Sequence, residues 1–228
     1  MYLKQIFITI MLAFLPHWLW ADEPIFFPTA TYVDSLGVEI PIEEKLTNEA
    51  PLDVTFMANG QNTEGRNISY EWHFRMEGEE TDYIVRYEEN MDYTFTNAGT
   101  TLVYFRAYEH EVLIGEAEFI IEITTSKLKM PNAFTPNGDG RNDTYKPMTH
   151  ESLVEFHAYI YNRYGQLLYD WTNPDAEGWD GTYRGKPVKD GVYFVLVKAK
   201  GADGVEYNIR KDVNLLRGYT LRETDATY

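Results

Sequence analysis

Cysteine is absent from this chain of 228 residues. Its absence excludes a disulfide framework, a thiolate metal site, a cysteine nucleophile and lipid attachment at a cysteine. The sequence also lacks Gly-x-Ser-x-Gly, a phosphate-binding loop and His-Glu-x-x-His, and its five histidines do not have the spacing of metal ligands. We therefore predict that the protein is not an enzyme and has no catalytic or cofactor-binding residues.

Long apolar runs are missing beyond the first residues. Lys4 precedes an apolar stretch at residues 6–15, which is shorter than the roughly 20 residues that a membrane-spanning helix needs. Ala21 fits the last position before a signal-peptide cleavage site. We predict a signal peptide at residues 1–21, export past the inner membrane and no transmembrane segment after cleavage. An uncleaved membrane anchor is the alternative.

Basic residues are scarce in the first half of the chain. Residues 22–126 contain 22 acidic and 5 basic residues, a net charge of −17, whereas residues 127–228 are neutral overall. This asymmetry is typical of two modules with different surfaces, at 22–126 and 127–217. The acidic module would repel nucleic acid and anionic lipid, so neither is an expected partner. Its charge indicates a solvated surface, with a cation or a basic partner as the alternative.

Short alternating segments rich in aromatic and β-branched residues predict an all-β fold. Phe119, Ile121 and Ile123 alternate with neighbours that include Glu118 and Glu122, as in a strand with one buried face. Clusters of Asn and Gly separate such runs. The predicted fold is two antiparallel, immunoglobulin-like β-sandwiches in tandem. In the acidic module the strand-like runs are 52–56, 68–74, 83–87, 100–108 and 116–123.

Two segments of the acidic module resemble a polycystic kidney disease (PKD) domain. They are Tyr-Glu-Trp-His-Phe at 70–74 and the stretch at 93–103, which contains Tyr-Thr-Phe and Gly-Thr-Thr. The resemblance implies that Trp72 lies in the core between two sheets; an exposed ligand platform is the alternative. The sequence departs from the family where Arg-Met-Glu-Gly at 75–78 replaces Gly-Asp-Gly, so a general immunoglobulin-like sandwich stays open. The pairs at 79–80 and 88–89 are interpreted as an exposed acidic rim, because adjacent strand residues point to opposite faces.

The second module contains the most specific motifs of the chain. They are Pro-Asn-Ala-Phe-Thr-Pro-Asn-Gly-Asp-Gly-Arg-Asn-Asp at 131–143, Tyr-Ile-Tyr-Asn-Arg-Tyr-Gly-Gln at 159–166, Gly-Trp-Asp-Gly at 178–181, Gly-Lys-Pro-Val at 185–188 and Asp-Gly-Val-Tyr-Phe at 190–194. In this order they resemble the gliding-motility-associated C-terminal domain, the type B sorting domain of type IX secretion in Bacteroidota. The resemblance covers about residues 130–217 and implies a protein of the cell surface or outer membrane. A polar tail at 218–228 follows.

Three smaller features are candidate sites or turns. Asn137, Asp139 and Asp143 could bind calcium through their side chains and Arg141 through its carbonyl; a loop stabilised by its own hydrogen bonds is the alternative. Asp-Ser-Leu at 34–36 resembles the O-glycosylation acceptor of Bacteroidota, which makes Ser35 a candidate. Trp179 is expected to pack on the sandwich beside an Asp-Gly turn.

Three functional hypotheses follow. The first is an exported surface protein in which the acidic module mediates protein interaction or spacing and the second module serves as the transport address. The second is a structural subunit of an outer-membrane or secretion complex, retained in the envelope and bound to a protein partner. The third is a polysaccharide-binding module with exposed aromatic residues.

Overall fold

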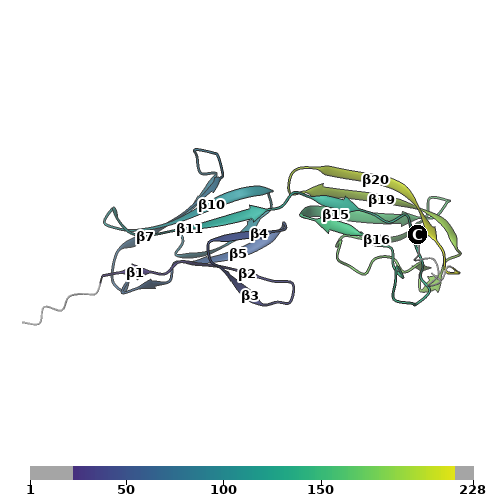
Figure 1. Cartoon of the computed structure of the whole chain (residues 1–228), viewed down its shortest axis with the longest axis horizontal. Coiled ribbons are helices and arrows are strands. Elements are labelled where there is room, and N and C mark those ends of the chain that lie inside the picture. The colour runs from purple at the N-terminus through teal and green to yellow at the C-terminus, as the bar shows by residue number, and fades with distance from the viewer. Residues whose placement is uncertain (1–22, 219–228) are drawn as a thin grey trace, which may run out of the picture.

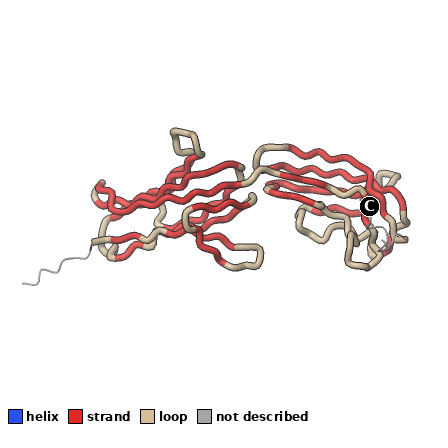
Figure 2. Tube along the Cα trace, in the orientation of Figure 1, coloured by secondary structure: helices blue, strands red, loops and turns tan. Residues whose placement is uncertain are grey.

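The computed structural model describes residues 23–218, and all regular elements in this range are strands (Figure 2). The strands form two β-sandwiches that lie end to end along the long axis of the molecule (Figure 1). This confirms the predicted all-β fold class. No helix within residues 23–218 is long and apolar enough to cross a membrane. The predicted signal peptide at 1–21 and the tail residues 219–228 lie outside the described residues.

The N-terminal sandwich packs a four-stranded sheet, ordered β3-β2-β5-β9, against a five-stranded sheet, ordered β4-β11-β10-β7-β8. The first sheet contains β2 (Thr29–Val33), β3 (Glu39–Ile42), β5 (Leu52–Met57) and β9 (Asn90–Phe95). The second contains β4 (Lys45–Asn48), β7 (Ile68–Met76), β8 (Ile84–Arg86), β10 (Gly99–Glu109) and β11 (Val112–Ile123). A short pair, β1 (Ile25–Phe26) with β6 (Gly60–Gln61), lies beside them.

Aromatic rings fill the space between these two sheets. Trp72 on β7 is fully buried, with its ring centroid 4.6 Å from that of Phe105 and 5.4 Å from that of Phe56 on the opposite sheet. Its indole N–H donates to the carbonyl of Glu88 at 3.0 Å, so the one polar group of the ring is satisfied. Trp72 is therefore a core residue, not an exposed platform. The acidic pairs at 79–80 and 88–89 are exposed.

The C-terminal sandwich has one large sheet, ordered β13-β20-β19-β15-β16, covered by shorter pieces. The sheet contains β13 (Ala133–Phe134), β15 (Leu153–Tyr161), β16 (Leu167–Trp171), β19 (Gly191–Gly201) and β20 (Glu206–Leu215). The covering layer contains the pair β12 (Lys127–Lys129) and β14 (Thr149–Glu151), and the hairpin β17 (Thr182–Tyr183) and β18 (Lys186–Pro187). Pairing is antiparallel except that β4 runs parallel to β11 and β13 runs parallel to β20.

Trp179 anchors the covering layer of the C-terminal sandwich. It is fully buried, with its ring 5.3 Å from Phe134 and 5.0 Å from Tyr193, and its N–H donates to the carbonyl of Thr182 at 2.7 Å. The Asp180 carboxylate accepts the backbone N–H of Thr182 at 2.9 Å and closes the turn that follows. The expected packing of Trp179 beside an Asp-Gly turn is present.

The two sandwiches are joined by hydrogen bonds, not only by the chain between them. Ser152 is buried, and its hydroxyl accepts the backbone N–H of Ala50 at 3.2 Å and lies 2.7 Å from the hydroxyl of Thr124. The backbone carbonyl of Ser152 accepts the N–H of Ala202, and the carbonyl of Ala202 accepts the N–H of Ala98. Ala202 also belongs to the apolar cluster of the N-terminal sandwich. We call these residues, with Ser126 and Asp203, the junction.

Asp203 binds the segment that connects the sandwiches. Its carboxylate accepts the backbone N–H of Ser126 at 2.9 Å and the hydroxyl of Ser126 at 2.7 Å. The Ser126 hydroxyl also lies 2.9 Å from the hydroxyl of Tyr207. The hydrogen bonds from Ser126 hold the pKa of Asp203 below its usual value. The chain passes from β11 into β12 within this network, so hydrogen bonds hold the connecting segment in place.

We expect the Asp203→Ala substitution to expose the connecting segment, because it removes both acceptors of Ser126. Limited trypsin digestion should then cut after Lys127 or Lys129 severalfold faster than in the wild type. Asp212→Ala, at an exposed position of β20, is the matched control and should leave the rate unchanged. Equal cleavage rates for all three proteins would contradict the proposal that Asp203 holds the connecting segment in place.

Candidate functional site

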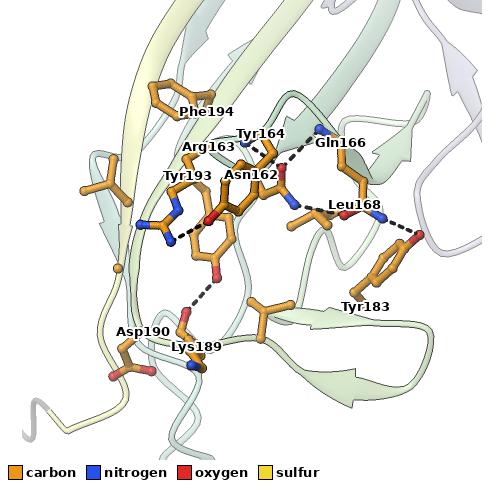
Figure 3. Close-up of a pocket in the computed structure, with 13 residues that line it drawn as sticks. Asn162, Arg163, Tyr164, Gln166, Leu168, Tyr183, Lys189, Asp190, Tyr193 and Phe194 are labelled. Carbon is orange, nitrogen blue, oxygen red and sulfur yellow. Dashed lines mark hydrogen bonds between the residues drawn. The ribbon is translucent and has the colours of Figure 1, made fainter.

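A groove with a volume of about 670 Å³ lies in the C-terminal sandwich. Three segments far apart in the sequence form it: the turn between β15 and β16, the hairpin strand β17, and residues 188–194 at the start of β19 (Figure 3). The first and third segments contain residues of the motifs at 159–166, 185–188 and 190–194, whereas β17 lies between two motifs. The sequence did not predict the groove, although its motifs include two of the segments that form it.

The turn at one side of the groove is fixed by Asn162. Its side-chain oxygen accepts the backbone N–H groups of Tyr164 at 2.9 Å and Gln166 at 3.1 Å. Its amide N–H₂ donates to the side chain of Gln166 at 2.9 Å, and Gln166 donates to the hydroxyl of Tyr183 at 3.0 Å (Figure 3). Gly165 closes the turn with a φ of 77°, a backbone conformation that favours glycine. These contacts hold the turn against β17.

Tyrosine and arginine side chains pair on both sides of the groove. The Arg163 guanidinium lies 4.8 Å from the centre of the Tyr164 ring and donates to the hydroxyl of that residue at 2.6 Å. The Arg184 guanidinium lies 5.2 Å from the centre of the Tyr183 ring. Such cation–π contacts stabilise rings that face water. Tyr164 is 79% exposed, so its ring is available to a ligand.

Asp190 is the one acidic residue of the groove lining, and Arg217 neutralises it. Its carboxylate accepts the backbone N–H of Arg217 at 2.7 Å and a guanidinium N–H at 2.9 Å. The same guanidinium donates to the carbonyls of Val188 and Gly181. Arg217 thus ties the end of β20 to the wall of the groove. This role of Arg217 was not predicted from the sequence, because its partners are distant in the chain.

Residues 128–210 match the CHU_C type IX secretion signal domain. Over these residues the C-terminal sandwich is similar to a type IX secretion signal domain. The match indicates a secreted protein of the cell surface or outer membrane. The groove therefore lies within the sorting domain and is formed by its motifs. No curated protein matches the chain.

Three solved structures match the chain at low identity and low TM-score. Chicken CNTN1 FN1–FN3 domains have 10% identity and a TM-score of 0.29, with 82% of this chain and 76% of that chain covered. Dimeric latent PorU from Porphyromonas gingivalis has 12% identity and a TM-score of 0.27, with coverage of 86% and 20%. The Bacteroides ovatus SGBP-B of a mixed-linkage glucan utilization locus, in complex with a heptasaccharide, has 12% identity and a TM-score of 0.29, with coverage of 85% and 47%.

The predicted calcium loop at 137–143 forms a network of its own hydrogen bonds. The Asp143 carboxylate accepts the backbone N–H groups of Asn137, Gly138 and Gly140 at 2.7 to 3.0 Å. Asp139 accepts the backbone N–H of Arg141 and the side-chain N–H₂ of Asn137. Within residues 23–218, no three His, Asp or Glu side chains are placed to hold a metal ion.

The backbone donors in this loop converge on the Asp143 carboxylate. The geometry corresponds to the self-bonded alternative for Asn137, Asp139, Arg141 and Asp143, and calcium binding stays a prediction. Ser35 lies at the exposed tip of the β2–β3 hairpin, where Asp34 accepts the N–H groups of Leu36 and Val38. Ser35 is accessible to a modifying enzyme, and its glycosylation also stays a prediction.

We expect Asp143→Asn to lower the melting temperature at neutral pH, since the amide replaces one acceptor oxygen by a donor. The backbone N–H groups of Gly138 and Gly140 lower the pKa of Asp143. A lowered folded-state pKa stabilises the fold above the usual pKa of Asp, and this stabilisation is lost as the pH falls through the lowered value. Melting curves from pH 7 down to about pH 2 should therefore converge for wild type and variant. Asp212→Asn is the control; a gap that persists in acid contradicts the assignment.

The calcium prediction has a separate test. A ligand that binds the folded state raises the melting temperature with its concentration. If the loop binds calcium, millimolar calcium raises the wild-type melting temperature, and Asp143→Asn removes the rise. An unchanged wild-type value eliminates the calcium site.

Proposed function

We propose that this chain is a non-enzymatic cell-surface protein whose C-terminal sandwich is its export address and whose acidic N-terminal sandwich mediates protein interaction or spacing. The observation that supports this most strongly is the family match over residues 128–210. The C-terminal groove supports it further, because the motifs of the match meet there. A sorting signal must be recognised by another protein, and this groove is a surface that such a protein can contact.

The interaction or spacing role rests on the surface of the N-terminal sandwich. Trp72 with Phe56 and Phe105 is buried and so is not an aromatic platform for a polysaccharide, whereas Phe27, Tyr83 and Tyr87 are exposed. On the outer face of the β3-β2-β5-β9 sheet, threonine hydroxyls donate to carboxylates on neighbouring strands, Thr31 to Glu39 and Thr55 to Asp92. A face of this kind is solvated and acidic, as a PKD-like spacer requires. A basic protein partner is the complementary ligand.

The junction favours a second candidate, a structural subunit that is retained whole in the envelope. A cargo protein that loses its address needs an accessible cleavage segment between the two parts. Here the backbone and hydroxyl of Ser126 bind Asp203, and Lys127–Lys129 pair with β14. A protease needs an extended and unpaired segment, which the described residues do not offer at this position. The two candidates therefore differ in whether the C-terminal sandwich remains attached.

Fractionation of producing cells, with and without a working type IX apparatus, tests the proposal. We expect the full-length protein on the outer surface only when the apparatus works, as detected by protease shaving of intact cells. The control is a periplasmic protein, which should stay protected in both strains.

The same fractions distinguish the two candidates. Recovery of the N-terminal sandwich without its C-terminal partner identifies a processed cargo. Full-length protein that purifies with an outer-membrane complex identifies the subunit. Full-length protein in the envelope regardless of the apparatus contradicts export by type IX secretion.

A further inference from the structure

The groove of the C-terminal sandwich has charged side chains that its own contacts leave unneutralised. Arg217 neutralises Asp190, so the remaining charged lining residues are Arg163 and Lys189. Neither forms an ion pair with a carboxylate among residues 23–218. Arg184 and Lys186 add two positive charges on the adjacent β17–β18 hairpin. The groove is thus a local positive site on a chain with a net charge of −16.

The groove also offers apolar contact area beside these charges. Val192 and Phe194 point outward at alternate positions of β19 and are 49% and 43% exposed. With the exposed Tyr164 ring they line the same groove as the basic residues. Tyrosine, phenylalanine and arginine are enriched in protein interfaces, and tyrosine and arginine dominate binding energy there.

The polar groups of the groove distinguish between ligand classes. A small polar ligand such as a sugar needs precisely placed donors and acceptors. Here the side chains of Asn162 and Gln166 bond to each other, and Gln166 to Tyr183, while the hydroxyl of Tyr193 donates to the carbonyl of Lys189 at 2.6 Å. These groups hold the groove together. The exposed rings and the basic side chains of the groove therefore remain available to a ligand. They favour an extended polypeptide that carries carboxylates and an aromatic or apolar side chain.

We propose that this groove binds an extended acidic segment of a partner protein, with Arg163 and Lys189 contacting carboxylates and Tyr164 and Phe194 packing against an aromatic or apolar side chain. The proposal deepens the proposed function, on which it rests for the existence of a protein partner. Because the groove is positively charged, charge complementarity requires a negatively charged partner segment. Arginine supplies paired donors to a carboxylate, and lysine supplies a point charge.

A labelled random copolymer of glutamate and tyrosine is a suitable probe, and the full chain without its predicted signal peptide is the protein. Fluorescence anisotropy at about 50 mM salt should detect binding that weakens at high salt, because the contacts are between exposed charges. Binding would occur against the overall repulsion between two acidic molecules, so it reports a local site.

The variants test whether the groove is that site. We expect Arg163→Glu with Lys189→Glu to weaken binding at least about tenfold, and Tyr164→Ala about fivefold, as for central interface residues. Lys198→Glu with Lys200→Glu makes the same change of charge on exposed residues of β19 outside the groove, and should stay within about twofold of wild type. All of these side chains are exposed, so the variants should keep the wild-type melting temperature.

Three results would overturn the proposal: no binding of the copolymer, equal losses in the groove and control variants, or displacement of the copolymer by polygalacturonate at equal carboxylate concentration. The last result would assign the groove to an acidic polysaccharide. These outcomes are independent of the export experiment. Binding without export rejects the proposed function alone, and export without binding rejects the groove alone.

Discussion

Burial of large rings between two layers of strands is the interaction on which both sandwiches depend. Side chains alternate between the two faces of a strand, so each strand must turn one face to the core. Trp72 with Phe56 and Phe105 fills the N-terminal core, and Trp179 with Phe134 and Tyr193 fills the C-terminal core. Because both indole N–H groups find backbone carbonyls, each ring also fixes a loop in position. The Trp179 contact with Thr182 positions the β17–β18 hairpin, and that hairpin forms one side of the groove.

The sequence predicted those elements whose pattern lies within one short segment of the chain. The alternation of Phe119, Ile121 and Ile123 corresponds to the inward face of β11. The packing of Trp179 beside an Asp-Gly turn was also predicted, because the turn residues directly follow the ring in the sequence. The parallel pairing of β4 with β11 and of β13 with β20 was not predicted. A parallel pair needs a long connection, and its register depends on the whole fold.

The groove and the junction could not be predicted for the same reason. The motifs at 159–166, 185–188 and 190–194 identified a family, but their meeting at one place depends on the pairing of β15 with β19. Asp203 precedes Gly204 in a turn, and its carboxylate also binds Ser126 across the boundary between the sandwiches. Arg217 lies just after the end of β20 and is the partner of Asp190. In each case a residue with a local role has a second, distant contact.

The junction has a mechanical consequence for a protein that works outside the cell. The described chain enters at one end of the molecule and leaves at the other (Figure 1). Tension applied to its two ends therefore passes through each sandwich and, between them, through the contacts of Ser152, Ala202 and Asp203. Several hydrogen bonds share this load, so the connection between the sandwiches resists bending. Such a molecule holds its far end at a fixed distance from the surface to which it is attached, whereas a flexible hinge would let that distance vary.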